Sequence, residues 1–334
     1  MSPGISLQAL GCALALIVVA SACDTQAPPV APPTRPFLVV ANQRSGVATL
    51  IELSSGRVSH LELGLKPHEV AVSPDSRIAA LTIPSEGFRS GRKVVVLDLA
   101  TGGVRRTINV GDYKDPHGLA FLSDSVALIG TLGGTSALYV DVRNGRVLRA
   151  IDGLPENPYV VKLTATGRAY VSSPHSSKVT EIDLAAQRVT RTIEIPDDPA
   201  GIAVSADGRE LYAAVWRQNA GGGIAIFDID KGVVAAKLPA TQPRRLTVTA
   251  DGRTVVVSDR DHLRIVDRAS RQTRSVDIGP NAGGSGVACA PDSARCYVAL
   301  SQAGEVVEVD LTSARVVRRF VAQQGVDGLG YVPR

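Results

Sequence analysis

Short apolar stretches separated by turn residues repeat along almost the whole chain. One unit begins at Pro67 with PHEVAV, continues through RIAALTI and KVVVLDL, and ends with VRRTINV. Each stretch has the length of a β-strand and is rich in Val, Ile or Leu, and turn residues such as Pro-Asp-Ser interrupt them. The pattern predicts four short strands per unit, which are called a to d in chain order.

The unit recurs at intervals of about 40–50 residues, a period typical of β-propellers, in which each unit forms one blade. Further units begin at Pro116, Pro158, Pro199, Pro243 and Gly284. A last unit begins at Val326 with strand a alone, and residues 37–63 supply strands b, c and d at the other end of the chain. We therefore predict an all-β, seven-bladed β-propeller, closed by pairing of the C-terminal strand with the N-terminal blade, because closure removes unpaired strand edges.

The units resemble the YVTN-type seven-bladed propeller repeat. The matching segments are AYVSS (169–173), CYVALS (296–301), VTEID (179–183), IAIFD (224–228), VVEVD (306–310), PHG (116–118) and SADG (205–208). The resemblance covers residues 37–334 and implies the propeller fold. It says little about activity, since this scaffold carries many unrelated functions.

The first 23 residues contain no charged side chain, and residues 9–20 are nearly continuous apolar sequence. About a dozen apolar residues are too few to span a bilayer but suit a signal peptide. The run ends in Ala20-Ser21-Ala22-Cys23, which resembles a bacterial lipobox. That resemblance implies a signal peptide at residues 1–22, a lipidated Cys23, and a membrane-anchored bacterial envelope protein facing the periplasm or exterior. The alternative is an ordinary Ala-x-Ala cleavage that releases a soluble protein.

Residues 23–36 are predicted to tether the propeller of residues 37–334 to its anchor, because residues 25–36 hold five prolines and favour an extended spacer. Within the propeller only Cys289 and Cys296 remain. Aligned on the unit at Pro199, they face each other across the a–b hairpin. An oxidising periplasm favours a disulfide between them.

The d–a and b–c connections emerge on one face and vary in length and chemistry, so we expect this variable face to carry the function. The residue after each opening Pro or Gly should ring the mouth of the central channel. These residues are His68, His117, Tyr159, Ala200, Arg244, Ser285 and Asp327. Converging polar groups suit a small-ligand site. The alternative is that the Pro-His and Pro-Gly pairs serve only the turn into strand a.

Two further features of the variable face are open to two interpretations. Trp216, the only tryptophan, stands beside Arg217 and either anchors a ligand by stacking or packs over the blade edge. His68 and His117 on adjacent blades suit metal binding or proton transfer. A metal requires a further ligand, for which only Glu69 or Asp327 is near, and so no metal site and no cofactor is predicted.

Residues that recur in every unit point apart and cannot form one site. The aspartates that end strand c are predicted to cap the c–d turns: Asp98, Asp141, Asp183, Asp228, Asp267 and Asp310. Arginines gather on strand d, at the outer edge of each blade, where charge prevents edge-to-edge pairing. A belt that binds anionic lipid or nucleic acid is the alternative. Bases would need aromatic side chains beside the arginines, and strand d offers only Phe320. The net charge of +4 does not call for a nucleic-acid partner.

The sequence contains no nucleophile elbow, phosphate loop or zinc-type His-Glu-x-x-His motif. The leading hypothesis is therefore a lipid-anchored binding module whose variable face takes a protein, glycan or small ligand. The first alternative resembles the seven-bladed lactonases, with His68, His117 and Arg244 as the base and oxyanion-stabilising residues. Nucleic-acid binding is the second alternative.

Overall fold

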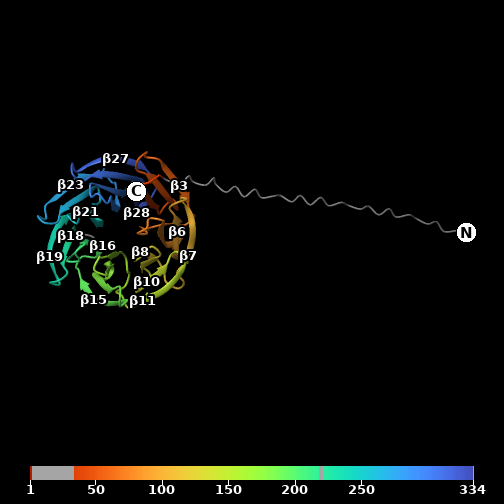
Figure 1. Ribbon diagram of the computed structural model, residues 1–334, viewed down its shortest axis with the longest axis horizontal. Coiled ribbons are helices and arrows are strands. Elements are labelled where there is room, and N and C mark those ends of the chain that lie inside the picture. Colours follow the sequence, from red (N-terminus) through yellow and green to blue (C-terminus); the bar gives the residue numbers. More distant parts are fainter. Residues whose placement is uncertain (2–33, 218–220, 334) are drawn as a thin grey trace.

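Seven four-stranded antiparallel sheets surround one central axis and form a closed ring in the computed structural model (Figure 1). The structure describes residue 1, residues 34–217 and residues 221–333. The predicted signal peptide, the lipobox Cys23 and most of the proline-rich tether lie outside the described residues. Within the described ranges, no helix is long and apolar enough to cross a membrane.

The blades follow one another in chain order, each with strand a innermost. Blade 1 contains β28 (Val326–Val332), β1 (Phe37–Asn42), β2 (Val47–Glu52) and β3 (Val58–Glu62). Blade 2 contains β4 (Val70–Val72), β5 (Ile78–Glu86), β6 (Arg89–Asp98) and β7 (Gly103–Asn109). Blade 3 contains β8 (Pro116–Phe121), β9 (Val126–Thr131), β10 (Ser136–Asp141) and β11 (Arg146–Ile151).

The remaining four blades repeat this order. Blade 4 contains β12 (Val161–Leu163), β13 (Arg168–Ser173), the 3-10 turn η1 (Pro174–Ser176), β14 (Lys178–Asp183) and β15 (Arg188–Glu194). Blade 5 contains β16 (Pro199–Val204), β17 (Glu210–Arg217), β18 (Gly221–Asp228) and β19 (Val233–Ala240). Blade 6 contains β20 (Pro243–Val248), β21 (Thr254–Asp259), β22 (His262–Asp267) and β23 (Thr273–Asp277). Blade 7 contains β24 (Gly284–Cys289), β25 (Arg295–Leu300), β26 (Glu305–Asp310) and β27 (Arg315–Val321).

The C-terminal strand closes the ring, as the split repeat predicts. β28 pairs antiparallel with β1, with Val332 opposite Phe37 and Leu329 opposite Val40. The predicted fold class, the seven blades and the closure are therefore confirmed. The C-terminal strand lies next to the first N-terminal strand in Figure 1.

The hydrophobic core is divided among the seven interfaces between neighbouring blades. One cluster, for example, joins Ile78 and Val94 of blade 2 to Leu119 and Ile129 of blade 3, and each further interface has its own cluster. Small and branched side chains fill these layers because neighbouring sheets stack face to face. The outer strands alternate between exposed and half-buried residues, as in β15.

The repeated polar residues lie where the turn and edge hypotheses place them. Asp98 Oδ1 accepts hydrogen bonds from the N–H groups of Ala100 and Thr101, which closes the c–d turn. Arginines of the outer strands form ion pairs with glutamates of their own blades, as Arg191 does with Glu181 and Arg318 with Glu308. The other five aspartates that end strand c accept equivalent backbone N–H hydrogen bonds, so the predicted turn capping is confirmed.

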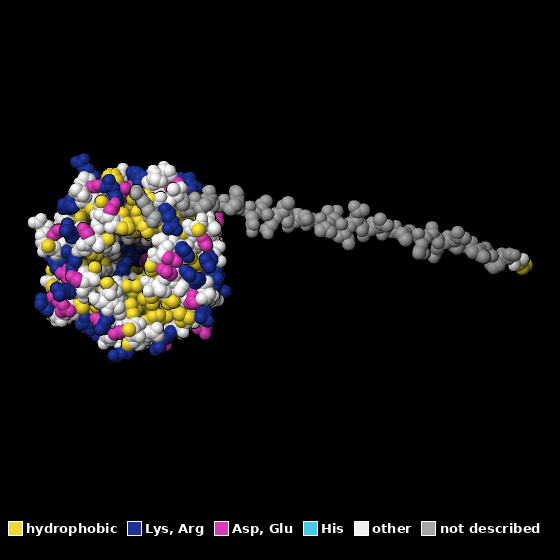
Figure 2. All heavy atoms as spheres, viewed as in Figure 1, with side chains coloured by type: hydrophobic (Ala, Val, Ile, Leu, Met, Phe, Trp, Pro, Cys, Tyr) yellow, Lys and Arg dark blue, Asp and Glu magenta, His cyan; other side chains and the backbone are white. Residues whose placement is uncertain are grey.

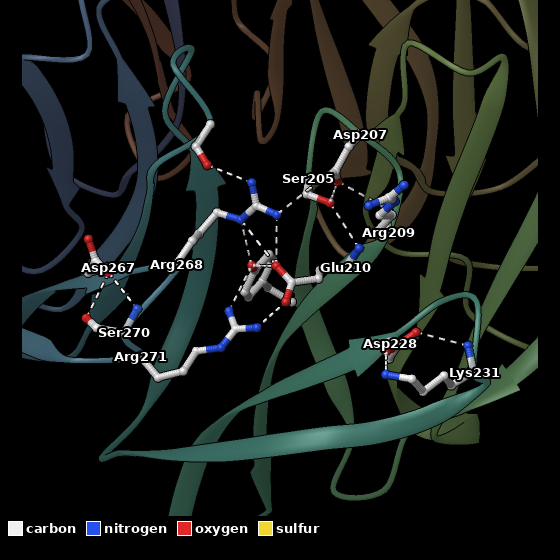
Figure 3. A network of polar contacts seen from close by, with 12 residues as sticks. Ser205, Asp207, Arg209, Glu210, Asp228, Lys231, Asp267, Arg268, Ser270 and Arg271 are labelled. Carbon is white, nitrogen blue, oxygen red and sulfur yellow. Dashed lines mark hydrogen bonds and ion pairs between the residues drawn. The ribbon is translucent and has the colours of Figure 1, made fainter.

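A denser set of polar contacts joins blades 5 and 6 on the face of the a–b and c–d turns (Figure 3). Arg268 and Arg271 both form ion pairs with Glu210, and the Tyr212 hydroxyl donates to the same carboxylate. Arg268 Nε also donates to the Tyr212 hydroxyl over 2.9 Å. We call Glu210, Tyr212, Arg268 and Arg271 the turn network.

Candidate functional site

The innermost strands approach one another closely at four of the seven blade junctions. Gly118 N–H donates to the Tyr159 carbonyl over 2.7 Å, and Gly328 N–H donates to the His68 carbonyl over 2.9 Å. A Cβ atom at Gly118 would lie 2.2 Å from the Tyr159 oxygen, and a Cβ at Gly201 would lie 2.0 Å from the Arg244 oxygen. Glycine is therefore required at this position, the third residue of the unit, wherever backbones meet directly.

At the other three junctions the third residue carries a side chain: Glu69, Val160 or Arg245. The N–H group of each donates to a hydroxyl on strand b of its own blade, Thr82, Ser172 or Ser258. The Ser172 and Ser258 hydroxyls then donate to carbonyls of the next blade, at Ala200 and Ser285. A serine hydroxyl thus links neighbouring blades at two of these three junctions. At the third position, Glu69 and Arg245 also bring an acidic and a basic side chain into the channel from nearly opposite sides of the ring.

Glu69 and Arg245 meet in the channel although they belong to blades 2 and 6. Arg245 Nε donates to Glu69 Oε1 over 3.0 Å, and the second guanidinium contact goes to the same oxygen. The guanidinium also lies over the Tyr159 ring, 4.9 Å from its centroid, and donates to the Tyr159 hydroxyl over 3.3 Å.

Two histidines complete the assembly. The His117 ring stacks on Tyr159 with centroids 4.1 Å apart, and the His68 and His117 centroids lie 4.2 Å apart. His68 Nε2 lies 3.1 Å from Asp327 Oδ2, and the Ser285 hydroxyl donates to the other oxygen of that carboxylate. We call His68, Glu69, His117, Tyr159, Arg245 and Asp327 the mouth cluster.

The electrostatics of the mouth cluster favour a neutral His117 and an ionised Glu69. Burial, reinforced by the charge of His68, holds the pKa of His117 well below its usual range. Burial opposes ionisation of Glu69, yet the charge of Arg245 and the His68 contact lower its pKa well below the usual value. In the narrow cavity of about 70 Å³ behind the cluster, desolvation lowers the pKa of Lys162.

Two larger pockets open on the variable face and reach the mouth cluster from different sides. One, of about 410 Å³, is lined by His68 and His117 and walled by the β5–β6 hairpin with the exposed Phe88. The other, of about 370 Å³, is lined by Tyr159, Arg245, Arg244 and the 41 % exposed Trp216. Figure 2 shows the ring hollowed at its centre, with basic side chains visible in the hollow.

The predicted ring residues divide into two groups. His68, His117, Tyr159, Ser285 and Asp327 come together in or against the mouth cluster. Arg244 and Ala200 instead line the pocket of about 370 Å³ beside Trp216. Arg244 is exposed, and the following residue, Arg245, enters the channel and contacts Glu69. Arg217 ends β17, and its side chain lies outside the described residues.

Cys289 and Cys296 lie directly opposite each other on β24 and β25 and are joined by a disulfide. This is the pairing that the repeat alignment predicts.

The sequence analysis missed Arg245 and Lys162, and considered Glu69 only as a metal ligand. A signal for two of them was present in the repeat itself. Four units carry glycine as their third residue, and Glu69 and Arg245 are departures from that glycine that introduce charge. No comparable signal marks Lys162, whose position on β12 follows only from the fold.

Comparisons with known proteins support the fold and leave the family open. No family model matches the chain. A stretch of 100 residues is 35 % identical to the uncharacterized protein YncE of Salmonella typhi and to that of Salmonella typhimurium strain LT2. The match covers 30 % of this chain and only 26 % of each relative.

Two solved structures share the architecture at low sequence identity. A functionally unknown protein from Desulfotomaculum acetoxidans DSM 771 aligns with a TM-score of 0.73 and 14 % identity, over 89 % of this chain and 99 % of that one. Hydrazine synthase of Kuenenia stuttgartiensis aligns with a TM-score of 0.68 and 17 % identity, over 78 % and 87 %. The chain is thus a seven-bladed β-propeller, a scaffold suited to binding and interaction.

Proposed function

We propose that this protein is a lipid-anchored binding protein of the bacterial cell envelope that takes up a small polar ligand at the mouth of its channel. The observation that carries the proposal is that two pockets of about 410 and 370 Å³ reach one buried polar cluster on the variable face. Volumes of this size suit a small ligand, and a few convergent polar groups with aromatic walls are typical of such sites.

The aromatic and basic walls favour a ligand of the glycan type. Trp216 and Phe88 are exposed beside Arg244 and Arg89 in the two pockets. An aromatic ring gives a sugar an apolar surface to stack on, and the neighbouring guanidinium groups donate hydrogen bonds to its oxygens. The YVTN-type repeat and the lipobox resemblance are consistent with a role at the envelope.

Binding of a panel of labelled neutral and acidic oligosaccharides tests the ligand. We expect Trp216→Ala and Arg244→Ala to reduce binding about tenfold or more without changing the melting temperature, since exposed positions alter stability by less than about 0.5 kcal/mol. His117→Gln should also reduce binding. Asp183→Ala and Asp228→Ala are the contrast, because these turn residues should lower the melting temperature and spare binding. The opposite pattern would show that the site lies on the other face.

Cell fractionation tests the anchor separately. Cys23→Ser should remove the lipidation site and move the protein from the membrane to the soluble fraction. Retention of the variant in the membrane fraction would contradict the anchor and leave the binding proposal intact.

One observation favours a second candidate, a lactonase-like hydrolase. His68 has one ring nitrogen against the Asp327 carboxylate, and its buried Nδ1 atom has no hydrogen-bond partner among the described residues. A histidine oriented by a carboxylate is the arrangement of a general base. Hydrolysis of a sugar lactone that disappears in His68→Gln would support this candidate, and lack of turnover by the unaltered protein would dismiss it.

A further inference from the structure

Three potential metal ligands face one another in the mouth cluster. A nitrogen of His68, a nitrogen of His117 and a carboxylate oxygen of Glu69 all lie within 4.8 Å of one another. In a tetrahedral zinc site with bonds of about 2.0–2.1 Å, ligand atoms lie about 3.4 Å apart. Side-chain rotations that move these atoms by about an ångström would therefore bring all three onto one ion.

The hydrogen bonds of both histidines orient their lone pairs. Nε2 of His68 lies 3.1 Å from Asp327 Oδ2, and this contact favours the tautomer with the proton on Nε2 and the lone pair on Nδ1. The Tyr159 carbonyl, 3.1 Å from Nδ1 of His117, accepts the proton there and leaves the lone pair on Nε2. Metal-binding histidines almost always donate their second ring N–H to a carboxylate or a carbonyl in this way.

His68 Nδ1 has no other role among the described residues. His68 is only 8 % exposed, and Nδ1 has no hydrogen-bond partner there. Its distance of 3.7 Å from Glu69 Oε1 is too long for a hydrogen bond. Buried polar atoms are nearly always satisfied, so an unpaired nitrogen that faces a carboxylate points to a group bound between them.

Arg245 is compatible with a cation beside Glu69. Both of its contacts go to Oε1, which leaves the second oxygen of the carboxylate for a further ligand. Glu69 and Asp327 carry two negative formal charges, and Arg245 and Lys162, which lines the cavity behind the cluster, carry two positive ones. The pocket of about 410 Å³ borders both histidines and gives an ion at this position an open side.

We propose that His68, Glu69 and His117 bind one divalent transition-metal ion, such as Zn²⁺, and leave a further coordination position open to the pocket. Two imidazoles and a carboxylate suit Zn²⁺ and related ions, whereas Mg²⁺ prefers oxygen ligands alone. Asp327 is a positioning residue that acts through His68. The proposal goes beyond the ligand-binding role, and it differs from the sequence-based prediction, which included no metal site.

Metal titration of the purified full-length protein tests the site. After treatment with a chelator, we expect one Zn²⁺ per chain to bind, and Co²⁺ to bind with the visible absorption of a nitrogen- and oxygen-ligated ion of low coordination number. Mg²⁺ in excess should displace neither ion. His68→Gln and His117→Gln should each weaken Zn²⁺ binding about 100-fold or more, and Asp327→Asn about 10- to 100-fold.

His262→Gln is the matched control, because this histidine lies on the variable face at the start of β22, away from the cluster. It should bind Zn²⁺ as the unaltered protein does. Far-ultraviolet circular dichroism shows whether each variant is folded, and the Co²⁺ spectrum of Asp327→Asn reports the site even if a ligand variant unfolds. Failure to bind one equivalent, or binding that survives loss of both histidines, would overturn the metal site. Oligosaccharide binding by the metal-free protein is measured separately, so failure of this proposal is distinguishable from failure of the ligand-binding proposal.

Discussion

The mouth cluster and the turn network are both assemblies of charged and aromatic side chains that join different blades, yet they differ in composition and in completeness. In the turn network two arginines and a tyrosine hydroxyl converge on the Glu210 carboxylate (Figure 3). In the mouth cluster a buried imidazole nitrogen of His68 remains without a hydrogen-bond partner among the described residues. A network in which the polar groups have hydrogen-bond partners stabilises the ring. A network that leaves a buried polar group without a partner is suited to binding a ligand.

Repetition separates the two assemblies further. Glu–Arg–Tyr sets related to the turn network recur in other blades, where Tyr170 donates to Glu181 and Arg191 pairs with the same carboxylate. The mouth cluster occurs once in the described part of the chain, because the residue types at the second and third positions differ from unit to unit and converge on the single axis of the ring. Residues that recur in every blade serve the fold. Functional residues are therefore better sought where a unit departs from the repeat.

Removal of β28 should have the largest effect, because it opens the ring and takes Asp327 from the mouth cluster. Val326, Leu329 and Val332 are buried in the structure. Their exposure alone should lower the free energy of unfolding by more than about 5 kcal/mol, comparable with the whole stability of many domains. Urea unfolding of the chain that lacks residues 326–334 measures this, with the chain that lacks only residue 334 as control. Unchanged unfolding would contradict the closure.

Glu210→Ala should destabilise the protein without affecting the channel. The carboxylate is partly buried, and its loss leaves Arg268 and Arg271 without their shared counter-ion. We expect a loss of about 2–3 kcal/mol, somewhat below the value for fully buried ion pairs. Lys231→Ala, which breaks an exposed ion pair with Asp228, should leave the melting temperature unchanged. Equal effects of the two substitutions would mean that the turn network is not a stabilising unit.

A matched pair of Tyr→Phe substitutions compares the two assemblies directly. The Tyr212 hydroxyl is bonded to Glu210, Arg268 and Arg271, so Tyr212→Phe should lower the free energy of unfolding by about 1–3 kcal/mol. The Tyr159 hydroxyl accepts one bond of 3.3 Å from Arg245, which keeps Glu69 as its partner. Tyr159→Phe should therefore change stability by less than about 0.5 kcal/mol. Chemical denaturation of both variants measures whether Tyr212→Phe lowers the free energy of unfolding more than Tyr159→Phe does.

Acid unfolding gives the smallest and most local test, at the c–d turn of blade 1. The hydrogen bond from Arg57, opposed by burial and assisted by Thr34 N–H and Ser55, lowers the pKa of Glu52 to about 2 from an ordinary 4.5. A depressed carboxyl pKa stabilises the fold above pH of about 4.5, and the contribution is lost as the pH falls toward about 2.

Glu52→Gln should therefore flatten the decline in stability between these pH values. Thermal melts from neutral to acid pH measure it, with Glu62→Gln at the exposed end of β3 as control. An acid decline of the same slope in Glu52→Gln and the unaltered protein would show that this carboxylate contributes nothing.

The sequence by itself determined the fold, because each blade is local. Four strands and their tight turns lie within about 40–50 consecutive residues, so the apolar pattern and the turn residues encode each sheet directly. The split unit at the two ends determined closure, and the aligned register placed Cys289 opposite Cys296. The capping role of Asp98 and its equivalents followed from recurrence alone.

Only the tertiary structure decided which side chains meet in the channel. Glu69 and Arg245 are 176 residues apart and contact each other because the ring brings blades 2 and 6 face to face across a narrow axis. The sequence pointed to Arg244, but in the structure Arg245 faces the channel and Arg244 is exposed. The repeat pattern reflects the pairing of neighbouring strands within a blade, whereas contacts across the axis depend on how the whole ring closes and brings distant units together.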